Sequence, residues 1–266
     1  MRKILVVFMA LFFAVSVFAQ GLYWQTKTEG TVAERATDNF AMPGKFKIVR
    51  TGDESEGAII IARLDKEVFW MLNPEKKTYS EMTFAEMEKM VNKAGAKLDD
   101  AMSKMQEEMK DMTPEQRAMV EKMMGGKMHG AQRASKIDIQ KSEKTKTIGG
   151  YSCTKYTVKQ DENEFMTLWV TKGVSGFDAM AADWKKFAER MSTMSPQSAK
   201  GMAEAYKKVD GFPMQTVMNM MGQTVTTTVT TVERRSTPAK EFDIPAGYKK
   251  VEGEWKKHMQ EMEQHE

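Results

Sequence analysis

Methionine is the residue type of this chain with the greatest capacity for unusual chemistry. The 266 residues include 26 methionines but only seven leucines. A thioether sulfur is a soft ligand that suits Cu(I), and an imidazole nitrogen can complete such a site. Two groups combine these ligand types at helical spacing: Met119, Met123, Met124 and Met128 with His129, and Met259 and Met262 with His258 and His265. A Met-rich copper-binding protein is therefore one alternative for the function.

Signatures of catalysis are missing from the sequence. It contains no nucleophile elbow, zinc-protease motif, phosphate-binding loop or dinucleotide fingerprint. Cys153 is the only cysteine, and His129, His258 and His265 are all distant from it in sequence. A small buried hydrophobic role therefore fits this cysteine better than a catalytic thiol. We expect no enzyme, no catalytic residue, no cofactor and no dedicated metal site.

Charge and length limit the class of protein further. The chain has 40 basic and 37 acidic residues, and loss of a leader containing Arg2 and Lys3 would leave 38 and 37. This balance argues against nucleic acid as a partner, since a nucleic-acid binder needs a basic surface for phosphates. With 41% hydrophobic residues, the length suits one main domain.

The first 19 residues have the pattern of a signal peptide. A basic start precedes an apolar run over residues 4–18, and Val17 and Ala19 provide small residues where a signal peptidase reads. The run of about 15 residues is shorter than the roughly 20 that a transmembrane helix needs. We expect cleavage after Ala19 and a soluble periplasmic protein, without a cysteine for lipid attachment.

Two helical insertions are predicted, near residues 83–124 and 178–208. The first opens with Thr83 and Glu86 at capping-box spacing. Its apolar stripe recurs at steps of three and four residues: Met87, Met90, Ala94, Leu98, Met102, Met105, Met109 and Met112. The stripe has three open interpretations, namely ordinary core, a deformable wall for an apolar ligand, and a source of soft metal ligands.

The remaining segments favour strands. Residues 58–64 and 67–72 flank the tight turn Asp65-Lys66, and both faces of this hairpin are apolar, so each face must be covered. Helices inserted between antiparallel hairpins predict an α+β fold, a curved antiparallel sheet with helices covering one face. We expect a single domain over 20–251 and a charged C-terminal helix or tail over 252–266.

Several segments resemble the bacterial envelope family known as domain of unknown function 4412. They are FWMLNPEKKTY at 69–79, TIGGYSCTKY at 147–156, LWVTK at 168–172 and FDIPAGY at 242–248. That family looks like a relative of the lipoprotein carriers LolA and LppX and of the sensor RseB. The resemblance implies a LolA-like half-open β-barrel whose helices close over an apolar cavity for acyl chains.

The resemblance also implies a ligand site and partners. Our candidates for the lining of the cavity are Trp70, Met102, Met105, Met109, Met112, Trp169, Met214 and Met218. The favoured function is a monomeric binding protein that holds a lipid, a lipoprotein acyl chain or another apolar ligand. The alternative from a different class is an envelope interaction or stress-response protein with a filled core, which would act on an envelope protein partner.

The export hypothesis has a direct test. When the protein is expressed with its own leader, the periplasmic fraction should contain a form that begins at Gln20, because the cleavage site follows Ala19. Intact-mass measurement and N-terminal sequencing of that fraction check this. A chain that keeps Met1 and stays in the membrane fraction would contradict soluble export.

Overall fold

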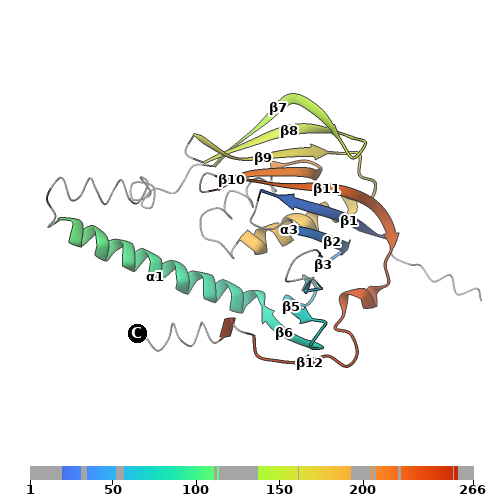
Figure 1. The fold of residues 1–266 in the computed structure, drawn as a ribbon, viewed down its shortest axis with the longest axis horizontal. Helices are drawn as coiled ribbons and strands as arrows, with labels where there is room; N and C mark the ends of the chain where they lie inside the picture. Colours follow the sequence, from blue (N-terminus) through green and yellow to red (C-terminus); the bar gives the residue numbers. More distant parts are fainter. Residues whose placement is uncertain are drawn as a thin grey trace, which may run out of the picture.

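A computed structural model describes most of the chain, and one large sheet dominates it (Figure 1). The described residues are 20–30, 35–51, 57–110, 113, 137–160, 162–192, 205, 208–220, 223–253, 255 and 256. The predicted signal peptide and most of the predicted C-terminal tail lie outside them. No helix in these ranges is long and apolar enough to cross a bilayer.

The sheet consists of two antiparallel meanders. The first contains β1 (Gln20–Glu29), β2 (Arg35–Met42), β3 (Lys45–Thr51), β4 (Ile59–Arg63), β5 (Val68–Asn73) and β6 (Thr78–Thr83). The second contains β7 (Ile137–Ile148), β8 (Tyr151–Gln160), β9 (Asn163–Thr171), β10 (Phe212–Met220) and β11 (Gln223–Ser236). A short strand, β12 (Lys249–Lys250), pairs in parallel with β6. The predicted curved antiparallel sheet is thereby confirmed.

The two meanders are joined by antiparallel pairing of β1 with β11. The register runs from Gln20 opposite Ser236 to Glu29 opposite Thr226, with an irregularity at Gln25 and Thr26. Gly30 follows β1 directly with a φ of 87°, and a Cβ there would lie 2.0 Å from the carbonyl oxygen of Thr224. Only glycine fits this close approach of the two backbones.

The β4–β5 hairpin has the register that its sequence predicts. Ala62 lies opposite Phe69, and Ile61 lies opposite Trp70. Ala62 and Phe69 belong to the main core, whereas Ile61 and Trp70 belong to a second core with Phe242. Because neighbouring residues of a strand point to opposite faces, both faces of this hairpin are covered, as its apolar pattern requires.

Helices contact the main core at two places. The helix α1 (Phe84–Lys110) begins with the predicted capping box, in which the Glu86 amide donates to Thr83 Oγ1 at 3.1 Å and the Thr83 amide donates to Glu86 Oε2 at 2.8 Å. Phe84 and Met87 are buried in the main core, and the helix then extends away from the sheet (Figure 1). The other contact comes from η1 (Asp178–Met180) and α3 (Ala181–Ser192).

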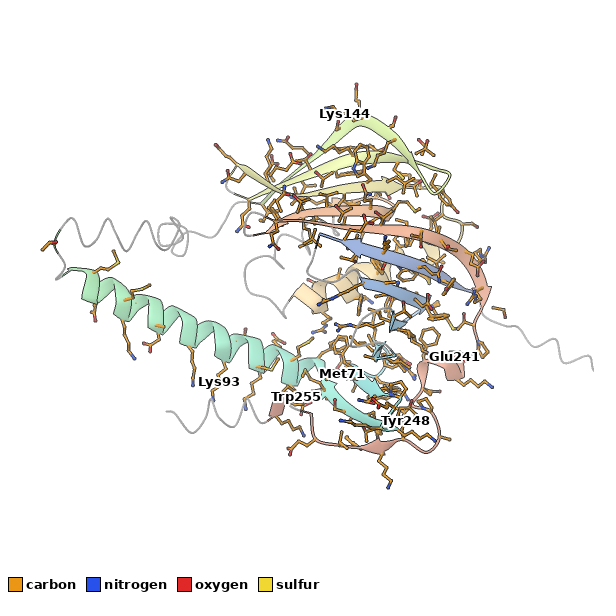
Figure 2. The ribbon with its side chains drawn as sticks, viewed as in Figure 1. Met71, Lys93, Lys144, Glu241, Tyr248 and Trp255 are labelled. Atoms are coloured by element: carbon orange, nitrogen blue, oxygen red, sulfur yellow. The ribbon has the colours of Figure 1, made fainter. Side chains whose placement is uncertain are left out.

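The strand β7 forms the edge of the sheet that lies farthest from β6 and β12, and this edge is strongly polar. Lys144 lies on this edge strand and points away from the sheet (Figure 2). The register of β7 with β8 shifts between Lys141 and Thr145. Charged side chains and an irregular register both hinder pairing with a further strand.

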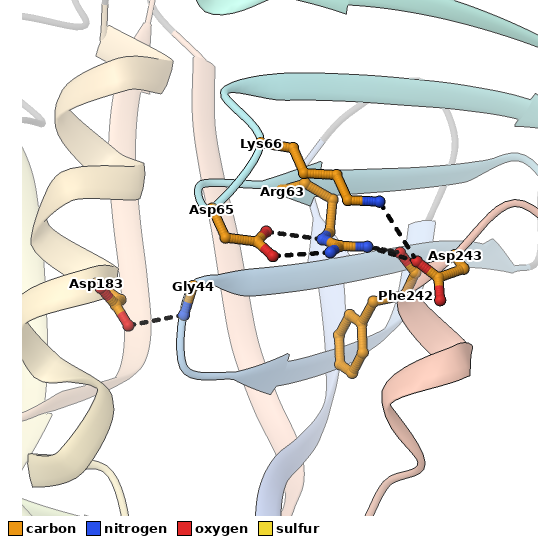
Figure 3. A network of polar contacts seen from close by, with 7 residues as sticks. All are labelled: Gly44, Arg63, Asp65, Lys66, Asp183, Phe242 and Asp243. Atoms are coloured by element: carbon orange, nitrogen blue, oxygen red, sulfur yellow. Dashed lines mark hydrogen bonds and ion pairs between the residues drawn. The ribbon is translucent and has the colours of Figure 1, made fainter.

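Arg63 attaches the C-terminal segment, residues 239–250, to the second core (Figure 3). Its side chain is 6% exposed and donates two hydrogen bonds of 2.7 Å to the Asp65 carboxylate. The same guanidinium donates to the main-chain oxygen of Phe242 at 3.2 Å and to Asp243. Phe242 ends the short helix η2 (Ala239–Phe242) and is fully buried. Hydrogen bonding from Arg63 lowers the pKa of Asp65 below its usual value.

A second polar contact holds β12 at the same end of the sheet. Glu81 accepts hydrogen bonds from Lys250 Nζ at 2.7 Å and from Trp70 Nε1 at 2.8 Å. These two donors, Lys250 above all, lower the pKa of the Glu81 carboxyl. Tyr248 lies on the C-terminal segment and packs against the second core (Figure 2). Phe242 before it and Lys250 after it hold this segment over the second core.

Replacement of the buried guanidinium should destabilise the whole domain. The change Arg63→Leu leaves the Phe242 carbonyl oxygen without its donor, and loss of such a buried bond costs about 1–3 kcal/mol. A lower midpoint of urea unfolding would report this loss. Lys172→Met is the matched control, because its ion pair with Asp210 is exposed on both sides and should contribute less than about 1 kcal/mol. An equal shift for both variants would contradict the role of Arg63.

Candidate functional site

An apolar cavity of about 220 Å³ lies between α3 and the sheet. Its wall is mainly aromatic and aliphatic, and the side chains come from β1, β3, α3, β10 and β11: Trp24, Phe46, Ile48, Trp184, Phe187, Phe212 and Val229. The lining also includes four uncharged polar residues: Thr26, Asn39, Thr216 and Thr227. Such a wall, apolar with few polar groups, is typical of small-molecule sites.

Aromatic rings of α3 pack directly on rings of the sheet. Phe187 stacks on Phe46 with a centroid distance of 4.6 Å, and Trp184 meets Trp24 edge-on at 5.7 Å. Trp24 also meets Phe212 edge-on at 5.7 Å. Edge-on and stacked pairs are the favoured arrangements of aromatic rings. They define one wall of the cavity and fix the position of the helix.

A hydrogen bond anchors the first turn of α3 to the sheet. The Gly44 amide, in the turn between β2 and β3, donates to Asp183 Oδ2 at 2.7 Å (Figure 3). Trp184 and Phe187 are three residues apart on this helix, so they point to the same side. The sequence therefore orients both rings toward the sheet once Asp183 is bound to the turn.

Charge is almost absent from the cavity wall. Lys47 is the one ionisable residue among the described residues that line it. Its ammonium lies 3.0 Å from the Glu241 carboxylate and 5.6 Å from the centre of the Phe40 ring. The positive charge of Lys47 is thus engaged with neighbours that belong to the C-terminal segment and to β2.

A larger cleft of about 720 Å³ lies between α1, α3 and the β2–β3 and β4–β5 turns. Its wall is charged, with the carboxylates of Asp65, Glu67, Glu88, Asp183 and Glu189 beside Lys186 and Arg190. Such a wall does not suit an apolar ligand. Nowhere in the described part of the chain are three His, Cys, Asp or Glu side chains grouped to hold a metal ion.

The tryptophan candidates from the sequence lie apart from this cavity. Trp70 belongs to the second core, where its ring lies 5.7 Å from the Arg63 guanidinium. Trp169 borders the main core, and Lys146 Nζ lies 4.2 Å from its ring centre. Met214 is buried in the same core.

The methionine candidates are spread over several elements. Met218 borders a third cluster formed by β8, β9, Ala205 and Val209. On α1, Met105 is half-buried and Met109 is buried. The side chain of Met102 and all of Met112 lie outside the described residues, as do both proposed copper-ligand groups. A binding role for these eight candidates stays a prediction.

Cys153 is fully buried in the main core, as its sequence context indicates. Burial raises the pKa of its thiol. A buried neutral thiol is a poor nucleophile, since thiolate is the reactive form. The observed environment is that of a small apolar side chain.

Comparison with known proteins places the chain in a family. A model described as "Domain of unknown function (DUF4412)" matches residues 85–248. The chain belongs to the DUF4412 family. The resemblance drawn from its strand and turn motifs is thereby confirmed. No curated protein matches the DUF4412 chain.

Three solved structures are similar to this DUF4412 protein at low identity. An uncharacterized conserved protein from Thermus thermophilus has 8% identity and a TM-score of 0.47, with coverage of 88% of this chain and 91% of that one. PNGF-II has 11% identity and a TM-score of 0.40, with coverage of 92% and 33%. MucB, in complex with MucA(peri), has 7% identity and a TM-score of 0.38, with coverage of 86% and 54%. The chain thus matches about a third of PNGF-II and about half of MucB.

Proposed function

We propose that this DUF4412 protein is an exported periplasmic binding protein that holds an acyl chain, or another apolar part of a lipid or lipoprotein, between α3 and the sheet. The observation that carries the proposal is the aromatic cavity beneath α3. Its apolar wall favours a hydrocarbon over a charged metabolite. This function needs no catalytic residue and no cofactor.

Cavity size defines how much of a ligand fits. Ligand sites usually measure about 300–1,000 Å³, and this cavity measures about 220 Å³. At about 30 Å³ for a group the size of water, it accommodates about seven groups, which is the end of an acyl chain. A longer chain requires α3 to move away from the sheet. We therefore propose that the fold takes the form of a half-open LolA-like barrel with helices over one face.

The small volume also supports a second candidate function. A largely filled core would leave this protein to act through its surface on an envelope partner rather than through a ligand. The charged cleft between α1 and α3 then becomes the surface of interest. Ligand binding distinguishes the two functions, because only the first requires an accessible cavity.

A filled cavity should weaken binding while the fold is kept. The change Ile48→Phe adds volume at the half-buried Ile48, which lines the cavity. We expect a bromine-terminated straight-chain alcohol to quench tryptophan emission in the parent, because Trp24 and Trp184 line the site, and to bind the variant at least about tenfold more weakly, a loss of about 1.4 kcal/mol.

Ile139→Phe is the matched control for this experiment. Ile139 is half-buried on β7, beside the third cluster rather than beside the cavity. Titrations of the parent and both variants by tryptophan fluorescence, with thermal unfolding recorded in parallel, give the answer. Absence of quenching in the parent would favour the filled-core function, and equal weakening by both variants would place the ligand elsewhere.

A further inference from the structure

One of the residues that line the cavity, Asn39, contributes a buried amide. Asn39 lies opposite Trp24 on β1 and opposite Ile48 on β3, so its side chain shares their face of the sheet. The residue is 5% exposed and lines the cavity. A polar group this deeply buried in an apolar site needs hydrogen-bond partners.

The amino group of Asn39 has its partners. Asn39 Nδ2 donates to the main-chain oxygens of Trp24 and Thr37, each at 3.2 Å, and to Thr37 Oγ1 at 2.8 Å. Two of these acceptors are carbonyl oxygens, which can only accept. The orientation of the amide is therefore fixed, and Asn39 Oδ1 must point away from them.

The carbonyl oxygen of Asn39 receives no hydrogen bond from any described residue. Four of the nearby threonine hydroxyls are paired with one another, Thr26 with Thr37 at 2.7 Å and Thr28 with Thr227 at 2.9 Å. Asn39 Oδ1 is thus a positioned acceptor at an apolar cavity. A ligand that offers a donor there would satisfy it, and a ligand without one would leave it unmatched.

Charge recognition at this position is unfavourable. A carboxylate only accepts hydrogen bonds, so its oxygens would repel Asn39 Oδ1. The nearest cation in the wall, Lys47, is paired with Glu241. A carboxylate buried here would lose its hydration without gaining a cation, and at Asn39 Oδ1 it would meet an acceptor instead of a donor.

From these contacts, and resting on the proposed function, we infer that the site selects neutral ligands in which a hydrogen-bond donor, a hydroxyl or an amide N–H, is joined to a short apolar chain. The donor binds Asn39 Oδ1 and the chain contacts Trp24, Phe46 and Phe187. Ionised fatty acids are rejected, although their chains are equally apolar.

Three probes of equal chain length test this selectivity: heptanol, heptanoate and heptane. Each competes with the bromine-terminated alcohol at pH 8, where heptanoate is ionised, and recovery of tryptophan emission reports displacement. We expect heptanol to bind at least tenfold more tightly than heptanoate and more tightly than heptane. Heptanoate binding as tightly as heptanol would overturn the inference, whereas failure of the brominated probe to quench at all would instead refute the proposed function.

A variant assigns the selectivity to one residue. Asn39→Leu replaces the amide by an apolar group of similar size, so the preference for heptanol over heptane should disappear while heptane still binds. Asn219→Leu is the matched control, since Asn219 lies on β10 and bonds to the exposed Thr224. An unchanged preference in Asn39→Leu would overturn the assignment. If this variant does not fold, the comparison of the three probes on the parent decides.

Discussion

The antiparallel pairing of β1 with β11 is the contact on which the rest of this structure depends. It joins two meanders that are each built from neighbouring strands, and the paired residues are separated by about 200 positions in sequence. The cavity draws Trp24, Asn39 and Phe46 from the first meander and Phe212, Thr227 and Val229 from the second. Without this pairing the two halves of the wall would not meet, and α3 would have no shared surface to cover.

The other face of the first meander is closed by the C-terminal segment. Arg63 and Glu81 each bind a residue of that segment, and Phe242 inserts its ring into the second core. Both carboxyls that take part, Asp65 and Glu81, have lowered pKa values, so they favour the folded state above their ordinary pKa range. This contribution is lost as the pH falls through the lowered values. The sheet that positions the cavity is thus held from both sides.

Local sequence patterns predicted the local structure well. The register of β4 with β5 follows from their apolar residues and short turn, and the capping box of α1 follows from Thr83 and Glu86. These features depend on neighbours within a few residues. The pairing of β1 with β11 could not be predicted in this way, because alternation within a strand carries no information about a distant partner.

The candidate site was harder to predict for the same physical reason. Its rings come from β1, β3, α3 and β10, which lie far apart in the sequence and share no local pattern. Trp70 was an equally reasonable candidate, since both faces of its hairpin are apolar and the pattern does not say which face meets a cavity. Among the described side chains of the methionine stripe of α1, those that meet the main core are Met87 and Met90, near the start of the helix. Composition therefore indicated an adaptable apolar interior but not its location.

Native mass spectrometry of the protein, expressed with its own first 19 residues and purified without detergent, tests the central claim most directly. If the space beneath α3 holds an apolar ligand, the folded protein should carry mass above that of its polypeptide. Organic extraction should remove that mass and yield a neutral acyl compound. A folded protein with the mass of its polypeptide alone, both as purified and after incubation with a membrane lipid extract, would contradict the account.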